Sequence, residues 1–323
     1  MSPLLGAFAI IVAATVALAL WSMGALRGRV RVSYRTEWSI GIYSGVSPLA
    51  LKPASGEAEC PVLTAADVTD VKASFVADPF LFKNKGTWYL FCEVYNTLVN
   101  RGQIGLASST DGKHFTYEQI VLDEPFHISY PYVFAWDHDI YMVPEGAAGG
   151  SVRLYKAEAF PHSWKFAGEL IKGPFCDSSL LRYKEKWWIF TCFEPSRHKD
   201  CHLFYADDLA GPYTEHPKSP IVKGDGHCGR PGGRFLTDGN GIVRFVQDCK
   251  PTYGKSLNAL EITMLSETEF EERPLQDNPV FTASGKGWNR HGMHHLDAHE
   301  LADGTWLGAV DGYRKYFSVH VEY

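Results

Sequence analysis

The chain of 323 residues lacks several sequence features that would identify a common class of protein. Its seven cysteines form no CxxC pair, so a zinc-ribbon site has no support, and an odd number excludes complete disulfide pairing. Cys92, Cys176 and Cys192 lie inside apolar runs, which indicates buried thiols. Charged residues make up 21% and hydrophobic residues 45%, a balance that excludes a chain disordered throughout.

Basic residues are too few for general nucleic-acid binding. The chain has 31 Lys and Arg against 37 Asp and Glu, and its net charge is -6. Four arginines but no acidic residue precede Glu37, so the rest of the chain is more acidic than the whole. Because an acidic surface repels a phosphate backbone, we expect no nucleic-acid partner.

The N-terminal segment lacks charge altogether, and its first charged side chain is Arg27. The apolar run at residues 3–21 is about 20 residues long, enough to span a bilayer. No basic region precedes it, as a secretory signal would require, and the arginines follow it, which favours a cytoplasmic C-terminal domain. We therefore predict a transmembrane anchor at residues 1–26, a basic juxtamembrane linker at 27–37 and a single-pass membrane protein. A cleaved signal and an exported, anchored domain are the alternatives.

The remainder of the chain contains a repeat and no evident long amphipathic helix. Short aromatic and β-branched runs alternate with turns from residue 75 onward, a pattern typical of strands. Five units each open with a polar residue before an apolar run, and an acid closes the second run of each. The equivalent opening residues are Asp78, Tyr130, Asp177, Arg230 and His295.

Units of four strands and about 50 residues are typical of β-propeller blades. We therefore predict an all-β fold, a five-bladed β-propeller over residues 38–323 that accompanies the N-terminal transmembrane helix. The segment from about residue 38 to residue 69 would complete the last blade. A two-sheet sandwich is the alternative, but it would not predict five equivalent openings.

The openings of propeller blades converge at one end of the central channel, where ligands bind. Asp78 and Asp177 supply two carboxyl groups, which glycoside cleavage needs on either side of the scissile bond. No opening carries a glutamate that could serve as the general acid. Glu145 or Glu194, each at the end of a second strand, is the better candidate for that role. The alternative is that these strand-end acids only cap turns.

Candidate binding residues gather in two motifs. Arg230 and Arg234 flank Pro-Gly-Gly beside His227, an arrangement that suits an anionic ligand approached closely by backbone. Structural arginines that bond backbone carbonyls are the alternative.

The run HGMHHLDAHE at residues 291–300 is rich in histidine. On a strand, His295 and Asp297 would share one face. We expect both to bind substrate together with Tyr130. We predict no catalytic metal and no other cofactor, beyond a cation that His295 could hold in the channel.

Several motifs also resemble known families. Asp78 in VADPFLF is similar to the first-blade catalytic Asp of the five-bladed propeller glycosidases of families 43 and 32. Asp177 in FCDSSLLRYKEKWWIF is similar to the Asp that tunes the general acid in family 43. Over roughly residues 38–320, the chain resembles more strongly the N-terminal module of plant glucosamine inositolphosphorylceramide transferases and its free-standing bacterial relatives. The segments that carry this likeness are VTDVKASFVADPFLF, SYPYVF, YMVPE, FPHSW, YADDLAGPYTEHPKSPIV, GRPGGR and QDC.

In the plant protein the recognised glycosyltransferase domain lies elsewhere in the chain, so the resemblance implies a glycan or glycolipid ligand rather than one reaction. Two hypotheses follow for a membrane-anchored, carbohydrate-active protein. The first is an enzyme, glycosyltransferase or glycoside hydrolase-like, that transfers or cleaves a glycosyl group on a glycolipid or envelope glycan. The second is a non-catalytic glycan- or lipid-binding module of an envelope-polysaccharide system.

Overall fold

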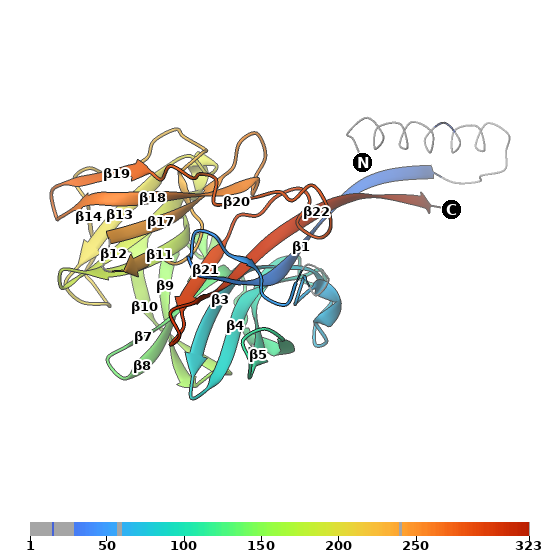
Figure 1. Cartoon of the computed structure of the whole chain (residues 1–323), viewed down its shortest axis with the longest axis horizontal. Coiled ribbons are helices and arrows are strands. Elements are labelled where there is room, and N and C mark those ends of the chain that lie inside the picture. The colour runs from blue at the N-terminus through green and yellow to red at the C-terminus, as the bar shows by residue number, and fades with distance from the viewer. Residues whose placement is uncertain (1–14, 16–28, 57–59, 239–240, 323) are drawn as a thin grey trace. The chain divides into compact units, whose positions relative to one another are not determined.

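The computed structural model describes residues 15, 29–56, 60–238 and 241–322. These fall into two compact units, one made of residues 37–314 and the other drawn from residues 1–36 and 315–323. The larger unit is a five-bladed β-propeller, which confirms the predicted fold (Figure 1). The described part of the smaller unit, apart from Thr15, consists of the outer ends of two strands, β1 (Arg29–Gly45) and β22 (Trp306–Glu322).

The predicted anchor at residues 1–26 lies, except for Thr15, outside the described residues. Within the described part of the chain, no helix is long and apolar enough to cross a membrane.

The first three blades are four-stranded antiparallel sheets built from consecutive strands. Blade 1 contains β3 (Ala73–Asn84), β4 (Thr87–Asn96), β5 (Arg101–Ser109) and β6 (Thr116–Leu122). Blade 2 contains β7 (Ser129–Trp136), β8 (Asp139–Glu145), β9 (Ser151–Ala159) and β10 (Ser163–Lys172). Blade 3 contains β11 (Phe175–Tyr183), β12 (Lys186–Phe193), β13 (Cys201–Ala206) and β14 (Thr214–Glu215). The short 3-10 helices η2 (Ala65–Asp67), η3 (Ala147–Gly149) and η4 (Glu194–Ser196) lie in connections.

The fourth blade is a six-stranded sheet with a short, interrupted inner edge. It contains β15 (Arg230–Pro231), β16 (Leu236–Asp238), β17 (Gly241–Asp248), β18 (Ser256–Leu265), β19 (Phe270–Pro274) and β20 (Phe281–Thr282). Both β15 and β16 pair with β17, and the GRPGGR motif lies at and just after β15.

The fifth blade joins the two ends of the propeller. Its strand order is β21 (Leu296–Glu300), β22, β1 and β2 (Lys52–Pro53), so the N-terminal segment supplies its two outer strands. This confirms the prediction that the segment beginning near residue 38 completes the last blade. Pairing with β1 covers the edge of β22 that would otherwise be open, and open strand edges invite aggregation.

Innermost strands of three blades share a local distortion that positions the site. Asp78, Tyr130 and Asp177 all have positive φ, at 52°, 47° and 48°. Each lies where the pairing register of β3, β7 or β11 with its neighbour shifts, which marks a bulge. A bulge redirects a side chain, and the left-handed conformation is less costly for Asp than for most residues. The repeat found in the sequence therefore reflects a repeated backbone conformation.

Candidate active site

A pocket of about 190 Å³ opens at the end of the propeller where the blade openings converge. Its walls include aromatic side chains from blades 1 and 5 and from the β17–β18 connection of blade 4, together with five acidic or basic groups. The aromatic residues are Trp38, Phe75, Tyr95 and Tyr253, and the ionisable ones are Asp78, Glu93, His127, Arg230 and His294. Sugar rings stack on aromatic faces of this kind. The sequence analysis included Asp78 and Arg230 in its site and did not select the others.

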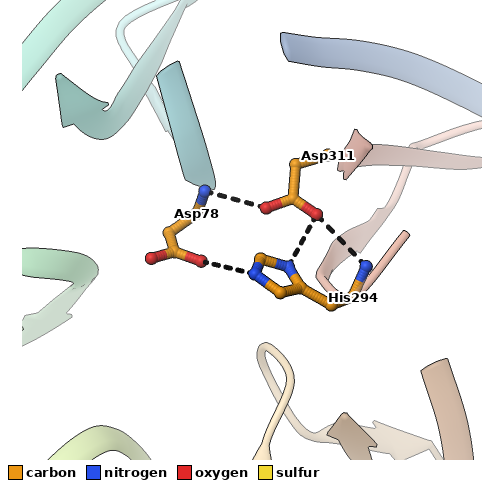
Figure 2. A group of neighbouring side chains, drawn as sticks. All are labelled: Asp78, His294 and Asp311. Carbon is orange, nitrogen blue, oxygen red and sulfur yellow. Dashed lines mark hydrogen bonds and ion pairs between the residues drawn. The ribbon is translucent and has the colours of Figure 1, made fainter. Parts of the chain in front are cut away.

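One group consists of Asp78 and His294, which line the pocket, and of Asp311, which contacts both (Figure 2). Asp311 on β22 accepts hydrogen bonds from the Asp78 backbone N–H at 3.0 Å and from the His294 ring Nδ1–H at 2.8 Å. The His294 backbone N–H also donates to it at 3.3 Å. The other ring nitrogen of His294, Nε2, lies 3.9 Å from Asp78 Oδ1 and 3.1 Å from the Tyr253 hydroxyl.

Burial changes the protonation of this group. Burial raises the pKa of Asp78 to about 8, even though the nearby His294 opposes the change. Burial lowers the pKa of His294, but the Asp311 carboxylate, with Asp78 behind it, outweighs burial and leaves that pKa above its usual value. Burial by itself would raise the pKa of Asp311, but the nearby His294 outweighs burial and holds that pKa low. Asp78 can therefore hold or release a proton near neutral pH, and His294 holds its proton more tightly than an ordinary histidine does.

A second group places two glutamates around His127. Glu93 lies opposite Ala77 in blade 1, and Glu145 lies opposite Ser129 in blade 2, so the two occupy equivalent positions beside the bulges. His127 Nε2 is 3.6 Å from Glu93 Oε1 and 3.7 Å from Glu145 Oε2.

These glutamates are the strongest candidates for the general acid. Burial, with Asp177 as a further cause, raises the pKa of Glu145 to about 7. Burial, followed by the Asp78 and Glu145 carboxylates, raises the pKa of Glu93 well above its usual range. A carboxylic acid kept protonated by its surroundings can donate a proton to a leaving group. The sequence analysis selected Glu145 and missed Glu93, although both close the second strand of a blade.

Asp177 and Arg230 form a buried ion pair rather than two independent binding groups. Arg230 donates from Nε and Nη2 to the two carboxylate oxygens of Asp177, at 2.5 and 2.9 Å. The Gln247 amide adds a third hydrogen bond at 2.6 Å. Arg230 also contacts His198 Nδ1 at 2.8 Å and lies over the Tyr253 ring at 5.2 Å. Arg230 therefore lines the pocket, but its guanidinium charge is already paired with the Asp177 carboxylate.

Arg234 and Asp297, expected to bind substrate, do not line the pocket and are bonded to each other. Asp297 is fully buried and binds Arg234 Nε at 2.5 Å, the Leu81 backbone N–H at 2.6 Å and His299 Nε2 at 3.0 Å. Arg234 donates in addition to the Val133 carbonyl at 2.8 Å. These bonds join blades 5, 4, 1 and 2, so the pair stabilises the ring.

Tyr130 and His295 lie deeper, within the packed centre. Both are fully buried, and neither lines the pocket. The Tyr130 hydroxyl bonds Ser179 at 2.8 Å and accepts the Gly233 N–H at 2.5 Å. His295 packs edge-on against Phe80 and Tyr130, and burial lowers its pKa to about 4. A cation at His295 stays a prediction.

The remaining two candidates lie on the surface. The His227 side chain is 61% exposed and pairs with Asp248 at 3.0 Å. Glu194 begins η4 and is exposed. The structure therefore brings neither residue to the pocket, whereas His294, the neighbour of the selected His295, is part of it.

Comparison with known proteins agrees with this architecture. The family model described as "Glucosamine inositolphosphorylceramide transferase 1, N-terminal" matches residues 31–313. The chain belongs to this family. Among curated relatives, glucosamine inositolphosphorylceramide transferase 1 of Oryza sativa subsp. japonica is 37% identical over 297 residues, and that of Arabidopsis thaliana is 36% identical over 299. Each alignment covers 86% of this chain but only 40% and 39% of the relative, so the chain spans about two fifths of their length.

Solved structures share the fold at low sequence identity. A β-1,2-mannobiose phosphorylase from Listeria innocua aligns with a TM-score of 0.61 and 14% identity, over 84% of this chain and 96% of its own. A thermostable family-43 glycoside hydrolase aligns with a TM-score of 0.53 and 14% identity, over 76% of this chain and 92% of its own. At this level of identity the structural likeness shows the fold alone.

Proposed function

We propose that the chain transfers or cleaves a glycosyl group on a glycolipid or envelope glycan in the pocket around Asp78. The observation that carries this proposal is the meeting of Asp78 with two buried, proton-holding glutamates beneath aromatic walls. Glycosidic bonds are broken by such a pair of carboxyl groups, one that donates a proton and one that is ionised during the reaction.

The chemistry assigns a role to each group. Protonated Glu145 or Glu93 donates its proton to the oxygen that leaves the sugar. Asp78 first passes its own proton to the neighbouring His294 and then, as the carboxylate, accepts the proton of the incoming hydroxyl. That hydroxyl belongs to an acceptor sugar or lipid in a transferase and to water in a hydrolase, so the same groups serve either reaction.

The relatives' name supports a glycolipid substrate. We infer that an inositolphosphorylceramide-type lipid and a glucosamine donor are the first compounds to test. We also infer that residues 3–21 anchor the chain in a membrane with the propeller on the cytoplasmic side, on the basis of the uncharged run and the arginines that follow it.

A second function, non-catalytic binding of a glycan or lipid, is favoured by one observation. Asp177, expected to be the second catalytic carboxyl, is neutralised by Arg230 and accepts a hydrogen bond from Gln247. A pocket that only binds sugar hydroxyls needs no second free carboxyl group, so it would tolerate the pairing of Asp177 with Arg230.

The two functions are separated by one experiment on the full chain. Wild type, Asp78→Asn and Glu145→Gln are incubated with an inositolphosphorylceramide and with a lipid extract of the source cell. Each is tested with and without nucleotide-activated sugars, including glucosamine, and mass spectrometry follows gain or loss of one sugar. Arg273→Gln, at an exposed ion pair, is the matched control.

We expect a mass change with wild type and Arg273→Gln, reduced at least about 100-fold in the other two variants, as for loss of acid–base catalysis. Dependence on the activated sugar would distinguish transfer from cleavage. Retention of a glycan or lipid on every variant, with no mass change in any, would support the binding module and reject the enzyme.

A further inference from the structure

Asp78 has a carboxylate oxygen that its surroundings do not satisfy. Asp78 is 4% exposed, and its Oδ1 is buried with no hydrogen-bond partner in the described structure. Figure 2 shows this oxygen directed at His294 Nε2, 3.9 Å away. That separation is too long for a hydrogen bond, and a buried oxygen without a partner costs free energy whether or not its carboxyl group is ionised. The gap between the two atoms therefore points to a missing partner.

The tautomer of His294 leaves Nε2 able to bind a cation. Asp311, whose pKa is held low, accepts the proton of Nδ1 at 2.8 Å, so the lone pair of neutral His294 lies on Nε2, on the side of Asp78. His127 provides the contrast. Its Nδ1 accepts the Gly102 N–H at 2.9 Å, so Nε2 carries the proton and faces Glu93 and Glu145 as a donor. The two pocket histidines therefore have opposite capacities for binding metal.

Asp311 fixes both potential ligands in place. One of its oxygens holds the His294 ring, and the other holds the Asp78 backbone N–H at 3.0 Å. A carboxylate that accepts the second ring proton of a ligating histidine is the usual support of a metal-bound imidazole. Ligand atoms from Asp78, His294 and Asp311 all lie within 4.8 Å of one another.

The charge around the pocket also favours a cation. Five carboxyl groups are buried there: Asp78, Glu93, Glu145, Asp177 and Asp311. Among the described residues that line the pocket, the one arginine, Arg230, is paired with Asp177. A bound divalent cation would let these acids ionise together without leaving a large uncompensated charge.

We propose that Asp78 Oδ1 and His294 Nε2 bind a divalent transition metal, Zn²⁺ or Mn²⁺, with Asp311 as the supporting carboxylate. Mixed imidazole and carboxylate donors suit these ions, and two bonds of about 2.1 Å at a wide angle span the observed gap. The Tyr253 hydroxyl, 3.1 Å from Nε2, becomes a third ligand or is displaced, and water or a substrate oxygen completes the shell. With a metal bound, Asp78 and His294 serve as ligands and do not carry protons. Metal binding is therefore separate from their roles in the proposed function, and it is measured without substrate.

The test uses the untagged full chain, stripped with a chelator and titrated calorimetrically with Zn²⁺ or Mn²⁺ alone. We expect one site per chain. We expect His294→Gln and Asp78→Asn to abolish that site and Asp311→Asn to weaken it by about 10–100-fold, the usual effect of losing a supporting carboxylate. His127→Gln is the matched control and should bind as wild type does, because its tautomer already excludes metal.

A spectroscopic measurement on wild type keeps the test independent of the folding of the variants. Co²⁺ should give visible d–d bands from nitrogen and oxygen ligands with no sulfur charge-transfer band. Three results would each overturn the proposal: no uptake by wild type, equal loss in His127→Gln and His294→Gln, or a Co²⁺–thiolate band from the cysteines.

Discussion

Asp177 shows at the scale of one residue how its neighbours set the state of a buried carboxyl group. The carboxylate is fully buried and is satisfied by Arg230 and Gln247. Its opening position in the repeat is equivalent to that of Asp78, and both have the same left-handed backbone conformation. What differs is the partner, an arginine in one case and a histidine in the other.

Removal of Arg230 should therefore destabilise the protein. Arg230→Ala leaves Asp177 buried without its bidentate partner, and we expect the free energy of unfolding to fall by about 3–5 kcal/mol. Urea denaturation followed by circular dichroism measures the change. Arg273→Ala, which removes an exposed pair with Glu261, should cost less than about 1 kcal/mol. Equal effects of the two substitutions would contradict a structural role for Arg230.

Glu145 should contribute a measurable pH dependence. Burial raises its pKa from 4.5 to about 7, so the folded protein holds this proton more tightly than the unfolded chain does. The stability that Glu145 contributes is complete below pH 4.5 and is lost as the pH rises through about 7. Relative to wild type, Glu145→Gln should gain about 1.4 kcal/mol for each pH unit between those values.

Thermal unfolding at a series of pH values, with chelator present, tests this expectation for Glu145. Glu118→Gln, at a surface pair with His162, serves as the control and should follow the wild-type curve. Parallel curves for wild type and Glu145→Gln would show that Glu145 ionises normally and would remove the main support for it as the general acid.

At the scale of an element, the glycines of the GRPGGR motif allow blades 4 and 5 to approach each other closely. Gly233 has φ of 136° and pairs with Leu296 of β21 in a parallel bridge. A Cβ added to Gly233 would overlap the Leu296 carbonyl group. The expected close approach of backbone to a ligand is therefore an approach to the neighbouring blade, and it brings the Gly233 N–H to Tyr130.

Gly233→Ala should consequently separate blades 4 and 5. It combines steric overlap with a left-handed backbone, and we expect the melting temperature to fall by several degrees or folding to fail. Gly146→Ala is the control, because φ there is -161° and the nearest side-chain atom would be 3.5 Å from the new Cβ. Similar melting temperatures for the two variants would contradict the contact at Gly233.

At the scale of the whole molecule, the ring depends on strands from both ends of the chain. Residues 37–45 of β1 pair in blade 5 with β22, and Ile40 and Ile42 are buried in the core shared with blade 1. Folding of the propeller therefore requires the closing blade, whose strands are far apart in sequence. Long-range closure of this kind is expected to make unfolding a single cooperative event.

Truncation tests the requirement for closure. A chain that ends at Thr305 lacks β22 and should show no cooperative thermal transition by circular dichroism. A chain that ends at Arg314 keeps the larger compact unit and should melt close to wild type. A cooperative transition in the shorter chain would show that four blades are stable without closure.

The amino-acid sequence alone was sufficient for the architecture. Strand periodicity and the five similar openings predict a five-bladed propeller, because a short repeat carries its own turns, bulges and apolar faces. The same repeat predicts that Asp78, Asp177 and Arg230 approach one another, and the ring confirms it. His295 was selected from the histidine-rich run, yet its neighbour His294 enters the pocket. Both lie just before β21, where strand alternation does not decide which way a side chain points.

The state of each group depended on three-dimensional contacts that sequence spacing does not encode. Asp297 bonds Leu81 and Arg234 across the ring, and Asp311 bonds Asp78 across a separation of 233 residues. Whether a carboxyl group is neutralised, protonated or left without a partner follows from burial and from the charge placed beside it. Those are properties of the closed ring, which is why Asp177 is paired with Arg230 while Glu93 and Glu145 retain protons near the pocket.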